Sequence, residues 1–207
     1  MARVLIIANG AWPESFNLER ELPNYSTLIA LDGASNRLLE RGIVPDVVVG
    51  DMDSIAPETL AHCRNKGAQI IHDSDQERSD ISKGLHWIEQ HDSTAEVSIV
   101  GVEIGRYDHH LAAYSSLFEH KSSATIHLNG WVARRVSAHP EQIAVQPGCL
   151  VSLIPFGKVT GVCLIGCQYS LEDATLVTGT RGVSNTAIES SITVSAKDGD
   201  LLLLVQR

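Results

Sequence analysis

The sequence predicts two domains of different class: a doubly wound parallel α/β domain over residues 1–130 and an antiparallel β-sandwich or barrel domain over residues 131–207. In the first part, short β-branched runs alternate with segments whose apolar residues recur at helical spacing, which is typical of a parallel sheet with crossover helices. From about residue 121 the helical spacing disappears, and β-type runs are separated by Pro, Gly, Asn and Asp. The turn dipeptide Asn129-Gly130 places the boundary between the two patterns.

The α/β domain is expected to contain six strands and four main helices. Apolar runs that end at Gly, Asn or Asp predict strands at residues 3–8, 27–31, 47–49, 68–71, 97–100 and 124–128. Apolar residues at helical spacing predict helices at 34–41, 57–66, 79–90 and 108–119, the first two ending at Gly42 and Gly67. Ser79 is the expected N-cap of the third helix.

The β domain is expected to contain seven short strands, the strand at 124–128 being the last of the α/β sheet. The predicted runs are 132–136, 143–145, 150–154, 159–164, 171–177, 192–196 and 201–205.

Composition narrows the function classes. The chain has 207 residues and a formal net charge of −9, which argues against a nucleic-acid-binding surface because that surface needs Lys and Arg to neutralise phosphates. No apolar stretch is long enough for a membrane span, and the N-terminal run is too short for a signal peptide. The four cysteines have no CxxC spacing, so we expect reduced thiols in a cytoplasmic protein. A small anionic ligand held through a metal ion remains compatible with the charge.

Two carboxylates follow the most apolar strand of the α/β part. The strand at 47–49 ends at Gly50, and Asp51 and Asp53 come directly after it, at the edge where open α/β sheets bind ligands. In an extended backbone both side chains would project the same way, about 7 Å apart at Cα. At an effective dielectric of about 20 they would repel by about 2 kcal/mol, so a distant basic side chain or a divalent metal such as Mg²⁺ is expected between them. The alternative is an Asx turn leading into the helix that Pro57 opens.

Two predicted helix starts carry further polar residues. Asp80 and Lys83 share one helical face, near Gln76 and Ser79, and could be either site residues or a surface ion pair. Arg106, Asp108 and His109 begin the next helix. Arg106 suits phosphate oxygens, whereas Asp108 could be only an N-cap and the pair His109-His110 one packed and one exposed ring.

The familiar phosphate-binding loops are missing. Gly157-Lys158 lacks the hydroxyl residue and the earlier glycine of a P-loop, and residues 101–105 do not match the dinucleotide fingerprint. A nucleotide site in this chain must therefore be built in another way.

Four motifs, in order across nearly the whole chain, resemble the thiamine pyrophosphokinase family. They are GDMDS at residues 50–54, DQERSDISK at 75–83, GRYDH at 105–109 and GVSN at 182–185. The resemblance implies a Rossmann-like N-terminal domain that binds ATP and Mg²⁺, a C-terminal domain that binds thiamine, and transfer of a diphosphate group from ATP to thiamine with release of AMP.

The resemblance also implies roles for individual residues. It assigns Mg²⁺ and catalysis to Asp51, Asp53, Asp80 and Asp108, and contact with the transferred diphosphate to Arg106 and Lys83. Substrate binding is implied for Asp32, Gln76, Ser79, His109, Ser184 and Asn185, the last two reaching thiamine held by the partner in a homodimer whose site lies at the subunit interface.

The chain departs from the family pattern at three places. Ala34 and Ile104 stand where glycines are common near the nucleotide loops, and residues 186–188 lack the aromatic found near this point in many relatives. Two alternatives stay open: a pterin pyrophosphokinase that uses the same acidic scaffold, and a thiamine- or nucleotide-binding regulator without catalysis.

Overall fold

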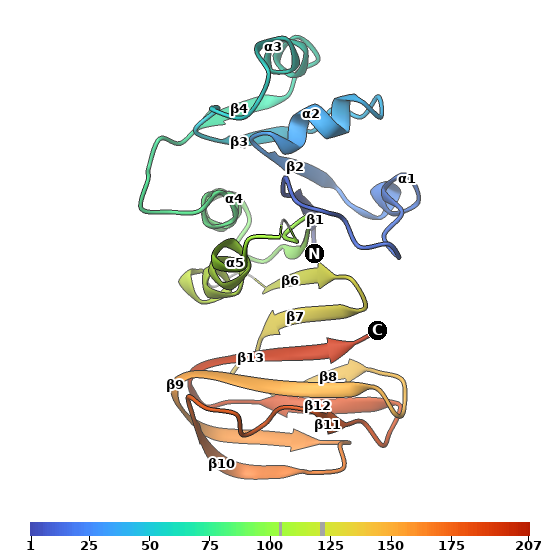
Figure 1. Ribbon diagram of the computed structural model, residues 1–207, viewed down its shortest axis with the longest axis vertical. Coiled ribbons are helices and arrows are strands. Elements are labelled where there is room, and N and C mark those ends of the chain that lie inside the picture. Colours follow the sequence, from blue (N-terminus) through green and yellow to red (C-terminus); the bar gives the residue numbers. More distant parts are fainter. Residues whose placement is uncertain (104, 121–122) are drawn as a thin grey trace. The chain divides into compact units, whose positions relative to one another are not determined.

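The computed structural model describes residues 1–103, 105–120 and 123–207. The chain divides into two compact units, residues 1–129 and 130–207, each with its own strands (Figure 1). Ile104, one of the departures from the family pattern, and residue 121, where the helical pattern was expected to end, lie outside the described residues.

The first unit contains a parallel sheet in the order β4-β3-β2-β1-β5-β6. Its strands are β1 (Arg3–Ile7), β2 (Thr27–Leu31), β3 (Val47–Gly50), β4 (Gln69–His72), β5 (Glu96–Val100) and β6 (Ser123–Leu128). All six predicted strands are found to within two residues, including the last one, which pairs with β5. The strands β2 to β4 are therefore added on one side of β1, and β5 and β6 on the other side, so the strand order reverses between β1 and β5.

Helices connect the strands. They are α1 (Leu18–Glu21), the 3-10 helix η1 (Leu22–Asn24), α2 (Ala34–Leu39), α3 (Pro57–Asn65), α4 (Asp80–His91) and α5 (Tyr107–Glu119). The four predicted helices are confirmed, and the Ser79 hydroxyl caps α4 by accepting from the Ser82 N–H. The prediction that Asp108 caps α5 is wrong: Arg106 occupies that position, and Asp108 lies in the first turn. The short α1 and η1 were not predicted.

Alternate residues of the strands pack on opposite faces of this sheet. Leu5 and Ile7 of β1 lie in a buried cluster with Ala34 and Leu38 of α2. Ile6 lies on the other face, below Gly84 of α4, where an added Cβ would come 3.5 Å from its Cδ1. Helices thus cover both faces, as a strand that is apolar at every position requires.

The second unit is built from antiparallel strands: β7 (Trp131–Arg135), β8 (Glu141–Ala144), β9 (Leu150–Ile165), β10 (Leu171–Val177), β11 (Asn185–Thr186), β12 (Ser191–Ser195) and β13 (Asp198–Gln206). The prediction of separate strands at 150–154 and 159–164 is wrong, because the chain continues through both as β9. Gly157 and Gly161, at φ of +86° and +66°, lie inside it. The first part of β9 pairs with β13 and β11, and the later part with β10 and β12, around a separate apolar core.

No helix in the described ranges is long and apolar enough to cross a membrane.

Candidate active site

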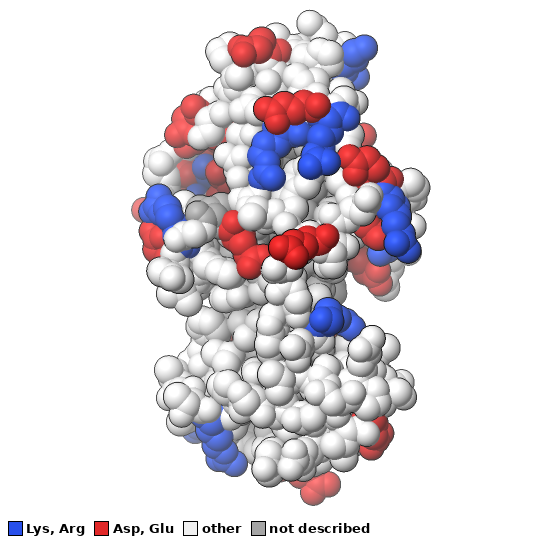
Figure 2. Space-filling view, turned by 45° about the vertical axis from the view of Figure 1, so that its right-hand side comes forward, with Lys and Arg blue, Asp and Glu red and all other residues white. Residues whose placement is uncertain are grey.

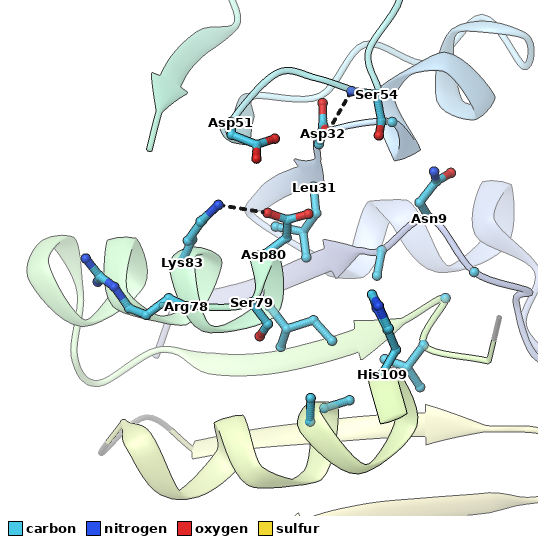
Figure 3. Close-up of a pocket in the computed structure, with 18 of the residues that line it drawn as sticks. Asn9, Leu31, Asp32, Asp51, Ser54, Arg78, Ser79, Asp80, Lys83 and His109 are labelled. Atoms are coloured by element: carbon cyan, nitrogen blue, oxygen red, sulfur yellow. Dashed lines mark hydrogen bonds and ion pairs between the residues drawn. The ribbon is translucent and has the colours of Figure 1, made fainter. Parts of the chain in front are cut away.

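A cavity of about 510 Å³ opens in the first unit where the strands of the parallel sheet end. The residues after β1, β2, β3 and β5 line it, together with the first turns of α4 and α5 (Figure 3). Its location includes the point between β1 and β5 where the chain changes direction, which is where open α/β sheets bind ligands. The polar lining side chains are Asn9, Asp32, Asp51, Ser54, Gln76, Arg78, Ser79, Asp80, Lys83 and His109.

Three carboxylates gather at this edge. One oxygen from each of Asp32, Asp51 and Asp53 lies within 4.8 Å of the other two. The sequence pointed to Asp51 and Asp53 from their spacing, and Asp32 also follows a predicted strand, but its role in binding was implied only by the family resemblance. Because β2 and β3 are neighbours in the sheet, the residues that follow them come together although they are about twenty positions apart. Three oxygen ligands so close together are a donor set that suits a hard dication.

The backbone between the two spaced carboxylates is not extended. Met52 has φ of +64°, and the Asp53 N–H lies 3.4 Å from Asp51 Oδ1, as in an Asx turn. The expected extended geometry is therefore wrong. The turn and the carboxylate cluster, which the sequence presented as alternatives, occur together.

Asp32 lies at the back of the cluster. It is only 3% exposed, and its two oxygens accept hydrogen bonds from the N–H groups of Ser54 and Ile55, each at 3.0 Å. The pKa of Asp32 is raised to about 6, mainly by burial and also by a hydrogen bond with Asp53 and the charge of Asp80, while the two N–H groups oppose the shift. A cation placed among these oxygens would favour the ionised form.

Lys83 supplies a positive charge beside the cluster. The Lys83 side chain is only 3% exposed, whereas that of Asp80 is 42% exposed. The Lys83 Nζ lies 3.3 Å from Asp80 Oδ1 (Figure 3). The alternative of a surface ion pair is therefore wrong for this lysine. Lys83 also contributes to lowering the pKa of Asp51, for which the larger cause is a hydrogen bond from the Gln76 amide at 3.1 Å. The distant basic side chain expected near the carboxylates is Lys83.

Three polar lining residues, Asn9, Ser54 and Arg78, were missed by the sequence analysis. Arg78 donates to Asp75 at 2.8 Å and lies 3.9 Å from Asp73, so acids that follow β4 hold it at the cavity. Asn9 follows β1 as Asp32 follows β2. The rule that found the other residues, polar groups after strand ends, could have found Asn9.

Glycine is required where the chain passes closest to itself at the cavity. A Cβ on Gly101, whose φ is +84°, would lie 2.2 Å from the carbonyl oxygen of Ala8. Hydrogen bonds from the Ala8 N–H to the Val100 carbonyl, at 2.8 Å, and from the Gly10 N–H to the Gly101 carbonyl, at 2.6 Å, hold these strand ends together.

Arg106 and Asp108 are arranged differently from the other predicted residues. Arg106 donates to Asp108 at 2.5 and 3.2 Å, and both side chains are more than half exposed. The pair lowers the pKa of Asp108 to about 2 through the hydrogen bond from Arg106. Neither residue lines the cavity, whereas His109 does. His109 is exposed and His110 half-buried, the latter 3.1 Å from the Tyr114 hydroxyl.

Ser184 and Asn185 belong to the second unit. Ser184 is exposed, with φ of +61° and its N–H on Ser152 Oγ. Asn185 is buried, and its amide bonds both the N–H and the carbonyl of Tyr169, at 3.1 and 2.7 Å. The Tyr169 ring remains 65% exposed and lines a cavity of about 360 Å³ in this unit.

Both units match families of known proteins. Residues 18–128 match the family described as "Thiamin pyrophosphokinase, catalytic domain", and residues 140–201 match "Thiamin pyrophosphokinase, vitamin B1 binding domain". Thiamine pyrophosphokinase of Bacillus subtilis is 27% identical over 99% of this chain and 98% of its own length. Thiamine pyrophosphokinase 1 of Oryza sativa subsp. japonica is 24% identical over 89% of this chain and 83% of its own.

Solved structures of two similar proteins have the same fold. The crystal structure of thiamine pyrophosphokinase from Bacillus subtilis has a TM-score of 0.82 at 22% identity and covers 99% of this chain and 98% of its own. That of thiamin pyrophosphokinase from Candida albicans has a TM-score of 0.80 at 17% identity, with 99% and 88% covered.

Proposed function

The chain belongs to the thiamin pyrophosphokinase family, and on that premise we propose that it transfers the β,γ-diphosphate of ATP to thiamine, giving thiamine diphosphate and AMP. The observation that carries the proposal is the cavity of the first unit, in which a buried lysine lies among carboxylates at the carboxyl edge of a parallel sheet. Binding of a neutral ligand would not need that concentration of charge, whereas a polyphosphate and its counter-ion do.

Diphosphate transfer requires in-line attack and control of charge. The hydroxyethyl oxygen of thiamine forms a bond to the β-phosphorus of ATP, the bond from that phosphorus to the α,β-bridging oxygen breaks, and AMP leaves with the electron pair. The chain's part is mainly positioning and neutralisation of charge. We assign Lys83, with Arg78 beside the cavity, to the phosphoryl oxygens. An ionised carboxylate of the cluster accepts the hydroxyl proton.

The carboxylates fit a divalent cation. Asp32, Asp51 and Asp53 are the proposed ligands, with Asp80 next to them, and their oxygens match the hard-donor preference of Mg²⁺. The cation would neutralise charge on the phosphates. Arg106 and Asp108 belong to the family motif but do not line the described cavity. We propose that they contact the substrates at its margin.

The second unit is proposed to bind the thiamine ring. Asn185 holds the backbone of Tyr169 from both sides, so the exposed ring is presented in a fixed position next to a cavity. We assign ring stacking to Tyr169, positioning to Asn185 and a polar contact to Ser184. In this proposal the first unit is a Rossmann-like catalytic domain and the second a β-sandwich domain.

The proposed assembly is a homodimer in which the second unit of one subunit completes the cavity of the other. The second unit exposes several large apolar side chains, and the face in Figure 2 shows few charged residues on it. Where such groups form one continuous patch, they mark an interface. The exposed large apolar side chains of the second unit are Phe156, Ile165, Tyr169, Val177, Val183 and Ile188. The four unpaired cysteines support a reducing, cytoplasmic location.

One assay separates the proposal from its alternatives. AMP release is measured from ATP and Mg²⁺ with thiamine, with a hydroxymethyl dihydropterin and with neither acceptor. Release that depends on thiamine is expected. Release only with the pterin would make the chain a pterin kinase. No AMP release in any of the three mixtures, while ATP and thiamine bind, would leave a binding protein.

A second experiment tests the shared site. The Asp53→Asn and Ser184→Val variants, each inactive alone, are mixed and allowed to exchange subunits. Activity should return, because one of the two sites in a heterodimer then has both residues intact. No recovery, with exchange demonstrated by differently tagged subunits, would confine the site to one chain.

A further inference from the structure

A second cluster of metal-binding side chains lies in the first unit, at the opposite end of α4 from the cavity residues Asp80 and Lys83. His86, Glu89 and His120 each offer one ligand atom, and the three atoms lie within 4.8 Å of one another. His86 and Glu89 are three apart in α4, so they share one helical face. His120 follows the last residue of α5, which packs against α4.

Hydrogen bonds around His120 leave two acceptors facing each other. The Ser82 hydroxyl has one proton and donates it to Glu119, so its oxygen, 3.1 Å from His120 Nε2, can only accept from that nitrogen. With its proton on Nε2, a neutral His120 directs the lone pair of Nδ1 at Glu89 Oε2, which is 3.1 Å away. A positive charge at that contact would satisfy both atoms.

The positive charge can be a second proton on the imidazole or a metal ion. His86 favours a metal, because its ring lies next to that of His120, with centroids 5.9 Å apart, and offers a third donor at the same place, although its Nε2 also lies 2.9 Å from the Gln90 amide. We propose that His86, Glu89 and His120 form a metal site, distinct from the carboxylate cavity, that takes a transition-metal dication such as Zn²⁺. Two imidazoles and one carboxylate suit such an ion better than Mg²⁺.

The surroundings of His120 match those of a metal-ligating histidine. Such a histidine commonly donates its second ring N–H to a hydroxyl or carboxylate that fixes the ring orientation. Here the chain from His120 through Ser82 to Glu119 does this, and Ser82 and His120 are both buried. A bound ion would link α4 and α5, the helices whose first turns line the cavity.

The test uses the full chain with two of the three proposed cavity ligands replaced, so that metal binding in the cavity is weakened. In an Asp51→Asn/Asp53→Asn background, Co²⁺ is titrated as a spectroscopic probe of nitrogen-ligated four- or five-coordinate sites, and Zn²⁺ is used to displace it. His86→Ala and Glu89→Gln are compared with His139→Ala, which removes an exposed imidazole in the other unit. His120 is kept because it is buried.

We expect one Co²⁺ per chain with visible absorption bands, displaced by Zn²⁺. His86→Ala and Glu89→Gln should each weaken binding by more than about tenfold, while His139→Ala leaves it unchanged. Zn²⁺ should also raise the unfolding temperature of the background protein but not that of His86→Ala, whose folding is checked by circular dichroism. Two results would overturn the proposal and mean that a proton occupies the contact. One is a background protein that shows no Co²⁺ bands. The other is a Co²⁺ affinity that is the same in the His86→Ala, Glu89→Gln and His139→Ala variants.

Discussion

Replacement of Asp53 by Asn tests whether the carboxylate cluster is built for a cation. The change removes one charge but keeps the shape and the oxygen that accepts from the Ser54 hydroxyl at 2.7 Å. If the cluster serves a bound cation, the variant should lose activity and gain stability in the metal-free state. Few other roles for a carboxylate predict both effects.

The gain in stability follows from Coulomb's law. Oxygens of Asp53, Asp32 and Asp51 lie within 4.8 Å of each other, and Asp53 is exposed, so the dielectric is close to that of water. Each of the two repulsions is then worth about 1 kcal/mol, and their removal about 2 kcal/mol at most. For a chain of this size that corresponds to a rise in unfolding temperature of about 4 °C.

The assay compares thermal unfolding in EDTA and in Mg²⁺ with AMP formation. Asp53→Asn should unfold at a higher temperature than the parent in EDTA, gain less from Mg²⁺ and form AMP about 100-fold more slowly. Asp198→Asn, which removes an exposed charge in the other unit, is the matched control and should do none of this. A variant that keeps most of its turnover, or that is less stable in EDTA, would refute the reasoning.

Three further predictions concern other parts of the chain. Burial raises the pKa of Asp32 to about 6, so the protonated group stabilises the metal-free protein and this contribution is lost as pH rises through about 6. Mg²⁺ affinity, measured by calorimetry, should therefore rise about tenfold between about pH 5 and about pH 7. An affinity that does not change with pH would contradict this prediction. Tyr169→Ala should raise KM for thiamine without changing KM for ATP, with Tyr169→Phe close to the parent; equal effects on both substrates would remove Tyr169 from thiamine binding. Burial raises the pKa of the Cys167 thiol to about 11, so iodoacetamide should modify Cys163 well before Cys167, as peptide mass spectrometry would detect; the reverse order would show that the buried thiol is accessible.

Local features of the sequence were sufficient to predict the strands and the four main helices of the first unit. The apolar runs that became β1 to β6 and the helical spacing of α2 to α5 are signals carried by neighbouring residues, as is the cap at Ser79. Motif order was enough to identify the family, because it depends on residue identity alone. The long β9 was predicted as two strands because Pro155 and Gly157 resemble a turn, whereas pairing with β13 through this stretch keeps it continuous.

Only the tertiary structure decided which polar residues meet. The burial of Lys83, the position of Asp32 beside Asp51 and the meeting of His86 with His120 all depend on pairing of strands and packing of helices that are distant in sequence. A carboxylate or an imidazole has the same local pattern whether it is solvated or forms part of a site. Its chemistry is set by the dielectric and the charges that the fold places around it, and these arise from contacts that sequence spacing does not contain.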